Sequence, residues 1–149
     1  MPKARSADVG GWKVIPFEVP HTNVDGTACQ NYAYIIERNN EKIVYLTDFM
    51  FCPFILSKFR INHFLIAINY TDLEDDGHGG IHHVMQGHSS LDTALEFLRV
   101  NVTDNCRSVI ACHVSERNGN ELKIMEGLVN TVPRVRTIAI AKKGITYEL

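Results

Sequence analysis

Apolar and polar residues alternate along several short runs of the chain, the pattern of strands with one buried face. The first run, WKVIPFEV, covers Trp12–Val19, and Pro16 within it favours an edge strand or a bulge. Two further runs, Tyr32–Glu37 and Lys42–Thr47, are separated by the polar tetrapeptide RNNE, which indicates a tight hairpin. This part of the chain is therefore expected to contribute three strands.

Apolar residues later repeat at intervals of three and four, which is typical of helices that pack one face on a sheet. One such segment is Ser90–Arg99, where the preceding serines offer a hydroxyl cap and Asp92 an acid in the first turn. A second segment, Glu121–Asn130, ends shortly before Pro133. The pattern predicts two helices in the second half of the chain.

The remaining apolar runs predict further strands around these helices. Buried strands are expected at Phe64–Asn69 and Ser108–Cys112, and the runs TIAIA and ITYEL predict a closing hairpin around Lys143 and Gly144. Residues 1–149 would then form a single mixed α/β domain, with both helices on one face of one sheet.

The composition adds few constraints on function. The chain has 149 residues with 15 Lys and Arg against 17 Asp and Glu, so its net charge of −2 provides no basic surface for nucleic acid or an anionic membrane. No apolar stretch is long enough to cross a bilayer and no secretory signal is recognisable, so we expect a cytoplasmic protein that binds no membrane. The four cysteines form no C-x-x-C pair and are expected to be free structural thiols.

Four polar residues stand at junctions between expected strands, loops and helices: His21, Asp48, His88 and His113. In α/β sheets, ligand groups converge at strand ends because the strand fixes the backbone while the loop leaves the side chain accessible. Imidazole nitrogen and carboxylate oxygen suit Zn²⁺, Mn²⁺ or Fe. A single His or Asp after a strand is more commonly a cap or turn residue, so the metal hypothesis depends on their joint arrangement.

Four segments resemble, in order over Val14–Glu116, the second half of a metallo-β-lactamase-fold hydrolase: PFEVPHTNVDGTACQNYAYIIE, KIVYLTDF, GHSSLDTALEFL and VIACHVSE. The branch they resemble includes ribonuclease Z and related metal-dependent nucleases and exonucleases. The resemblance implies an α/β fold that is half of an αββα sandwich, with one mixed sheet and helices on one face.

The resemblance also implies roles for the four junction residues. His21, Asp48 and His113 match metal ligands, with Asp48 in the position of the carboxylate that bridges two metals. His88 matches a residue that assists the leaving group or the scissile phosphate. Zinc is the expected metal, with Mn or Fe as alternatives or no metal retained.

The family motif H-x-H-x-D-H, which supplies most ligands of the first metal, is absent from this sequence. The segment Asp72–Gly87 contains several Asp and His residues, but His82 and His83 are adjacent and the segment is expected to be a solvated loop. We expect the chain to be a half-domain that completes its site across an oligomer interface, a fragment of a split protein, or a degenerate family member.

Three functional hypotheses follow from these patterns, and the last of them is a mononuclear metal-binding protein without turnover. The first is a metal-dependent hydrolase of a phosphodiester or nucleic-acid substrate, in which metal ions activate water and stabilise the developing oxyanion. The second is a catalytically inactive half-domain that serves as an assembly module, as a homodimer or with a separate chain that supplies the missing half. In either case the uncovered apolar face of the sheet is expected to be buried by a partner.

Overall fold

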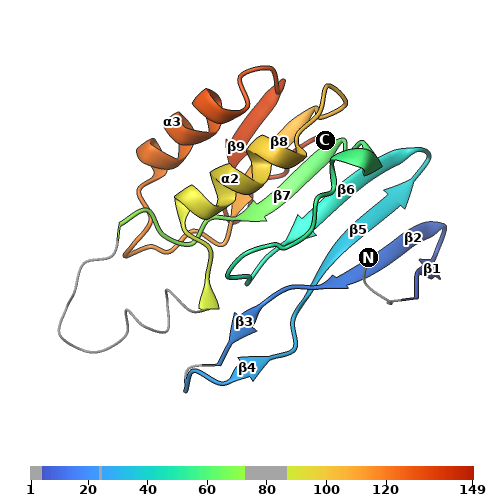
Figure 1. Ribbon diagram of the computed structural model, residues 1–149. Helices are drawn as coiled ribbons and strands as arrows, with labels where there is room; N and C mark the ends of the chain where they lie inside the picture. Colours follow the sequence, from blue (N-terminus) through green and yellow to red (C-terminus); the bar gives the residue numbers. More distant parts are fainter. Residues whose placement is uncertain (1–4, 24, 73–86) are drawn as a thin grey trace.

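The computed structural model describes residues 5–23, 25–72 and 87–149. The chain forms a seven-stranded mixed sheet in the order β1-β2-β5-β6-β7-β8-β9, with helices α2 and α3 packed on one face (Figure 1). The mixed α/β fold expected from the hydrophobic pattern is confirmed. The Asp- and His-rich loop expected to be solvated lies almost entirely outside the described residues.

One half of the sheet is antiparallel. Its strands are β1 (Ala7–Val9), β2 (Trp12–Glu18), β5 (Tyr32–Arg38) and β6 (Glu41–Leu46). The expected tight hairpin joins β5 to β6, with φ of 51° at Asn39 and 65° at Asn40, as a two-residue turn with left-handed central residues requires. Between β2 and β5 the chain forms a small separate sheet of β3 (His21–Thr22) and β4 (Ala28–Cys29).

The other half of the sheet is parallel. Its elements are β7 (His63–Ala67), α2 (Leu91–Asn101), β8 (Ser108–Cys112), α3 (Glu121–Thr131) and β9 (Thr137–Ile140), with a short 3-10 turn η1 (Ser57–Phe59) before β7. Strands β6, β7, β8 and β9 pair in parallel, so α2 and α3 serve as crossover connections. The expected hydroxyl cap is Ser90, whose side chain accepts a hydrogen bond from the Thr93 amide at 3.1 Å.

The expected C-terminal hairpin is wrong. The run TIAIA forms β9, but residues 145–149 form no strand. The Tyr147 hydroxyl donates a hydrogen bond to the Ile140 carbonyl at 2.8 Å and accepts one from the Lys142 amide at 3.2 Å. A side chain therefore occupies backbone groups that a returning strand would have paired. Strand β1 was missed, because its sequence ADV is exposed and too short to show alternation.

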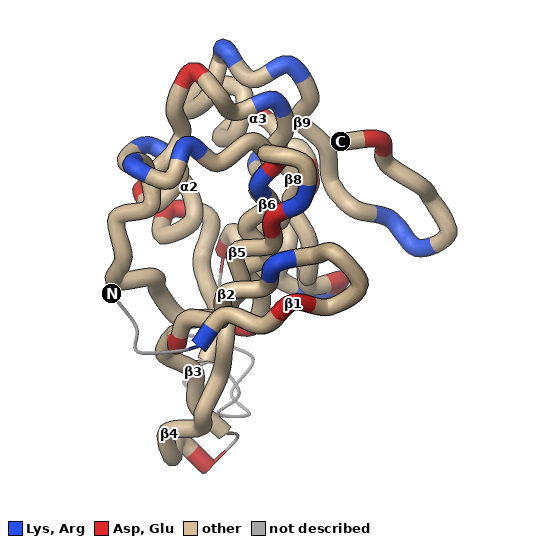
Figure 2. The backbone as a smooth tube through the Cα atoms, turned by 90° about the vertical axis from the view of Figure 1, so that its right-hand side faces the viewer, with Lys and Arg blue, Asp and Glu red and all other residues tan. Residues whose placement is uncertain are grey.

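The two faces of the sheet differ in what covers them. Alternate residues such as Val44, Leu46, Phe64 and Ile66 are fully buried beneath the helices, which contribute buried side chains including Leu98. Figure 2 shows the helices on one side of the strands and the C-terminal segment projecting from the other. In the described residues no helix is long and apolar enough to span a membrane.

His63 lies on the face opposite the helices and is 2% exposed. Its Nδ1 atom lies 2.7 Å from Ser108 Oγ, and its Nε2 atom lies 3.2 Å from Glu41 Oε2. Burial lowers the pKa of His63, so the folded protein holds a neutral imidazole at pH values where the unfolded chain binds a proton. This group therefore destabilises the fold as the pH falls below about 6.5 and has no such effect above that value.

We predict that His63→Gln weakens the acid dependence of stability. Between pH 7.5 and pH 5.5, the urea midpoint should fall less in the variant than in the wild type, although the variant starts from a lower stability. Urea denaturation at the two pH values measures both. An equal loss in the two proteins would contradict the role assigned to this buried imidazole.

Candidate metal centre

Three polar side chains meet at the edge of the sheet where the parallel strands end. Asp48 follows β6 after one intervening residue, His113 follows β8 directly, and His88 stands just before α2, which connects β7 to β8. Because parallel strands end at the same edge, residues far apart in the sequence converge there. Helix α2 begins at this edge because Ser90 caps it and a parallel bridge pairs Tyr70 with Ser90.

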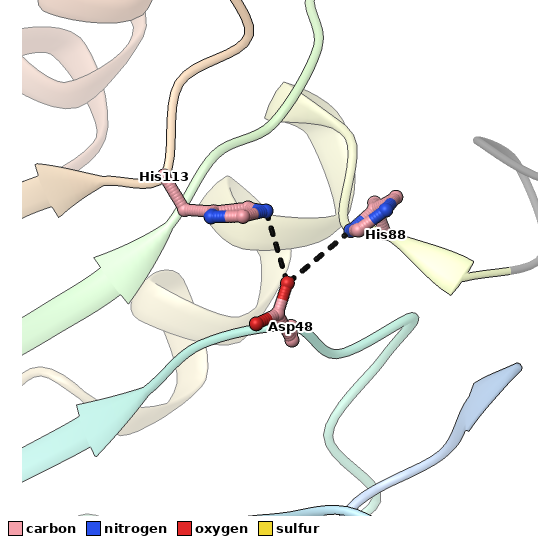
Figure 3. Close-up of side chains that lie close together, drawn as sticks. All are labelled: Asp48, His88 and His113. Carbon is pink, nitrogen blue, oxygen red and sulfur yellow. Dashed lines mark ion pairs between the residues drawn. The ribbon is translucent and has the colours of Figure 1, made fainter. Parts of the chain in front are cut away.

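Asp48 lies between the two imidazole rings (Figure 3). Its Oδ1 atom is 2.9 Å from His113 Nε2 and 3.6 Å from His88 Nδ1. The rings of His88 and His113 have centroids 5.4 Å apart. The side chains of Asp48 and His113 are 41% and 40% exposed, against 17% for His88, so solvent reaches the group from one side.

These three residues fit a divalent cation. One carboxylate oxygen and two imidazole nitrogens all lie within 4.8 Å of one another. Ligand atoms at 2.0–2.2 Å from a tetrahedral zinc ion are about 3.4 Å apart, and the two separations from Asp48 Oδ1, 2.9 Å and 3.6 Å, lie close to that spacing. A carboxylate with two imidazoles is also the mixed donor set that borderline cations such as Zn²⁺, Mn²⁺ and Fe²⁺ accept.

Two of the three residues have a backbone conformation that side chains disfavour. The φ angle is 48° at Asp48 and 53° at His113, which places both in the left-handed region. Such a conformation costs about 1–3 kcal/mol for a residue other than glycine, and it persists only where the surrounding structure holds it. Both strained residues stand at the site edge of the sheet, which is where strain of this kind typically accompanies function.

His21, the remaining candidate ligand, lies beside this group but is not one of its members. Its ring centroid is 5.3 Å from that of His88, and its Nδ1 atom is 2.5 Å from the Gly87 carbonyl oxygen. Because a carbonyl only accepts, Nδ1 must carry a proton, and in the neutral ring Nε2 then carries the lone pair. A histidine held in this way has the tautomer that binds a metal or takes a proton through Nε2.

Cys112 precedes His113, but its thiol is not suited to react. Burial, with a further contribution from the negative charge of Asp48, raises the pKa of Cys112 to about 11. Burial likewise raises the pKa values of Cys52 and Cys106 to about 11. All four cysteines are free thiols, as the sequence predicted, and these three stay protonated near neutral pH.

The structure therefore brings together Asp48, His88 and His113, and it places His21 next to them. Asn31 and Asn69, which were not candidate residues in the sequence, contact the backbone of this group through hydrogen bonds to Asp48 and His113. Asparagine is common at strand ends and turns, so Asn31 carried no signal in the sequence, whereas Asn69 with Tyr70 and Asp72 resembles an E-x-N-Y-D segment of the exonuclease-like branch.

Comparisons with known proteins show the fold. No protein-family model matches the sequence, and no curated protein sequence matches it. Among solved structures, yeast PDE1 superposes with a TM-score of 0.63 at 18% identity, over 97% of this chain and 48% of PDE1. Igni18, a metallo hydrolase from Ignicoccus hospitalis, gives a TM-score of 0.64 at 13% identity, over 97% of this chain and 58% of Igni18.

A Thermotoga maritima protein assigned to the Zn-dependent hydrolases of the metallo-β-lactamase superfamily gives a TM-score of 0.52 at 12% identity, over 94% of this chain and 70% of that protein. These matches confirm the α/β sheet of the metallo-β-lactamase type that the sequence motifs led us to expect. The chain spans about half the length of yeast PDE1 and Igni18.

Proposed function

We propose that this chain is part of a metal-dependent hydrolase that cleaves phosphodiesters, with its metal held by Asp48, His88 and His113. The observation that carries the proposal is the convergence of one carboxylate and two imidazoles at a solvent-accessible sheet edge. A bound divalent cation would supply Lewis acidity and lower the pKa of a coordinated water. The similarity to metallo hydrolases such as Igni18 supports this chemistry.

The four site residues would have different roles in this chemistry. Asp48 supplies the negative charge that attracts the cation and lies within reach of both imidazoles. His113 and His88 complete the donor set through Nε2 and Nδ1. His21 donates from Nδ1 to the Gly87 carbonyl, so its Nε2 is the nitrogen placed to bind a second cation or to exchange a proton with the leaving oxygen. His88 was assigned that proton role from the sequence, and its Nδ1 contact with Asp48 supports a ligand role instead.

The charge distribution favours a small phosphodiester over a long nucleic acid. Of the residues that the structure describes around the site, segments 19–23, 25–31, 47–57, 68–72 and 87–90 contain no Lys or Arg. In Figure 2 most Lys and Arg segments lie in the upper part of the molecule, away from β3 and β4. Binding of extended nucleic acid depends on neutralising many phosphates, which these segments cannot do.

Three ligands are few for a hydrolytic centre with two metals, so we propose that further donors come from a second half of the same architecture. That half would be a second copy of this chain or a separate polypeptide segment. The similar solved structures are longer than this chain, which supports a site assembled from two halves.

The first test is metal binding. We predict that the chain binds about one Zn²⁺, and that Asp48→Ala or His113→Ala weakens binding at least tenfold because one of three ligands is lost. Isothermal titration calorimetry measures both effects. Asp72→Ala is the matched control, since Asp72 is an exposed acid paired with Lys123. Affinity unchanged in the Asp48 and His113 variants would contradict the site.

The second test is hydrolysis of bis(p-nitrophenyl) phosphate and of short single-stranded RNA with Zn²⁺ or Mn²⁺ present. We predict that turnover of the small diester exceeds that of RNA, and that His21→Ala lowers kcat by about 10²–10⁴-fold if it moves the proton. Release of p-nitrophenolate is followed by absorbance. Intact Zn²⁺ binding by a dimeric chain without any turnover would overturn a hydrolase completed by a second copy of this chain, and would favour the second candidate function below.

The second candidate is an assembly module without catalysis, and the open face of the sheet supports it. Strand register aligns Tyr34, Tyr45, Leu65 and Ile110 in one row across four strands, on the face opposite the helices. Within this row Tyr45 is 38% exposed and Ile110 is 3% exposed, so the accessible part of the row lies around Tyr45. An apolar row of this kind is stabilised by a partner surface in water, and we propose a homodimer.

We predict that Tyr45→Glu shifts the chain from dimer to monomer, because a charge would be buried between the two open faces. Sedimentation velocity at micromolar concentration measures the change. Leu122→Glu is the matched control, since Leu122 is 83% exposed on α3 and belongs to the helix layer. A wild-type chain that is already monomeric would contradict self-association through this face.

A further inference from the structure

We propose that Asn31 and Asn69 are positioning residues of the metal centre, each holding one strained ligand residue through its backbone carbonyl. This inference deepens the proposed function and rests on it. The geometry that carries it is a pair of matched contacts: an asparagine amide donates to the carbonyl of Asp48, and another donates to the carbonyl of His113.

Asn69 connects two segments of the site at once. Its side-chain Nδ2 donates to the His113 carbonyl at 3.1 Å, and its own carbonyl accepts from the Ser115 amide at 2.9 Å. Its backbone amide donates to the carbonyl of Ser89, the neighbour of His88, at 3.0 Å. Asn69 is a buried polar residue, with 9% exposure. Its hydrogen bonds connect it to the segments that carry His88 and His113.

Asn31 makes the corresponding contact on the other side of the site. Its Nδ2 donates to the Asp48 carbonyl at 2.5 Å and approaches the Thr47 carbonyl at 3.3 Å. Its own carbonyl accepts from the Val19 amide at 3.0 Å, which ties the turn after β6 to the segment that leads to His21. Asn31 directly precedes β5, so a sheet strand anchors it.

These contacts hold the backbone conformations of Asp48 and His113. Asp48 and His113 are the two site residues with left-handed backbones, and both have their carbonyls bound by an asparagine. The backbone angle sets the direction in which the side chain leaves the sheet edge. Loss of either amide would let the residue relax toward ordinary angles and move its ligand atom away from the common centre, while the ligands themselves stay in the chain.

The test uses Co²⁺ as the probe, because both its affinity and its visible spectrum report on ligand geometry. We expect Asn69→Ala to bind Co²⁺ about 10–100-fold more weakly than wild type, with an altered absorption band. Asn101→Ala is the matched control. Asn101 is also buried and also bonds to backbone, donating to the Phe97 carbonyl at 2.8 Å, but it lies at the far end of α2 from His88. It should lose stability without losing Co²⁺ affinity.

A second pair keeps the proposal testable if Asn69→Ala does not fold. Asn31→Ala should also weaken Co²⁺ binding about 10–100-fold. Asn62→Ala should leave Co²⁺ binding unchanged. Asn62 is half-buried, and its side-chain oxygen accepts a hydrogen bond from the Lys42 backbone amide at the opposite end of the sheet. Wild-type affinity and spectrum in both Asn31 and Asn69 variants would overturn the positioning role alone. Failure of the unmodified chain to bind Co²⁺ would overturn the proposed metal centre and the positioning role with it.

Discussion

The parallel pairing of β6, β7 and β8 is the constraint on which the rest of the structure depends. It aligns Leu46 with Ile66 and Ala67 with Cys112, so the chain leaves all three strands at one edge of the sheet. Parallel pairing also requires long crossovers, and the segment between β7 and β8 brings His88 back to that edge before α2 begins. The site is thus a consequence of how the strands pair.

The same edge concentrates conformations that would be unfavourable elsewhere. Asp48 and His113 have positive φ angles, and the buried hydroxyl of Ser89 donates to the Ala67 carbonyl at 2.6 Å beside them. A sheet whose core residues such as Phe64 and Leu46 are fully buried provides the rigidity that holds these local conformations. Stability of the layer beneath the helices and geometry at the edge are therefore linked.

The two faces of the sheet suggest how catalysis and assembly relate. The helix-covered face is a closed core, whereas the opposite face presents the row through Tyr45 and Leu65. A partner on that open face would lie along the same strands that end at Asp48 and His113. A partner bound there would both bury the open face and supply further metal ligands. The hydrolase and assembly-module proposals then differ only in whether the completed site catalyses hydrolysis.

The sequence alone determined most of the elements, because strands such as Ser108–Cys112 and the helix capped by Ser90 have local patterns that specify them. It also singled out His21, Asp48, His88 and His113 as candidate site residues, since each stands where an element begins or ends, and the tertiary structure brings Asp48, His88 and His113 together. It did not determine which histidines would contact Asp48, or which groups Asn31 and Asn69 would contact. It also did not determine that the C-terminal ITYEL run forms no strand. Those depend on atoms far apart in the chain, such as the Tyr147 hydroxyl and the carbonyls of Asp48 and His113, and only tertiary packing brings such atoms within hydrogen-bond distance.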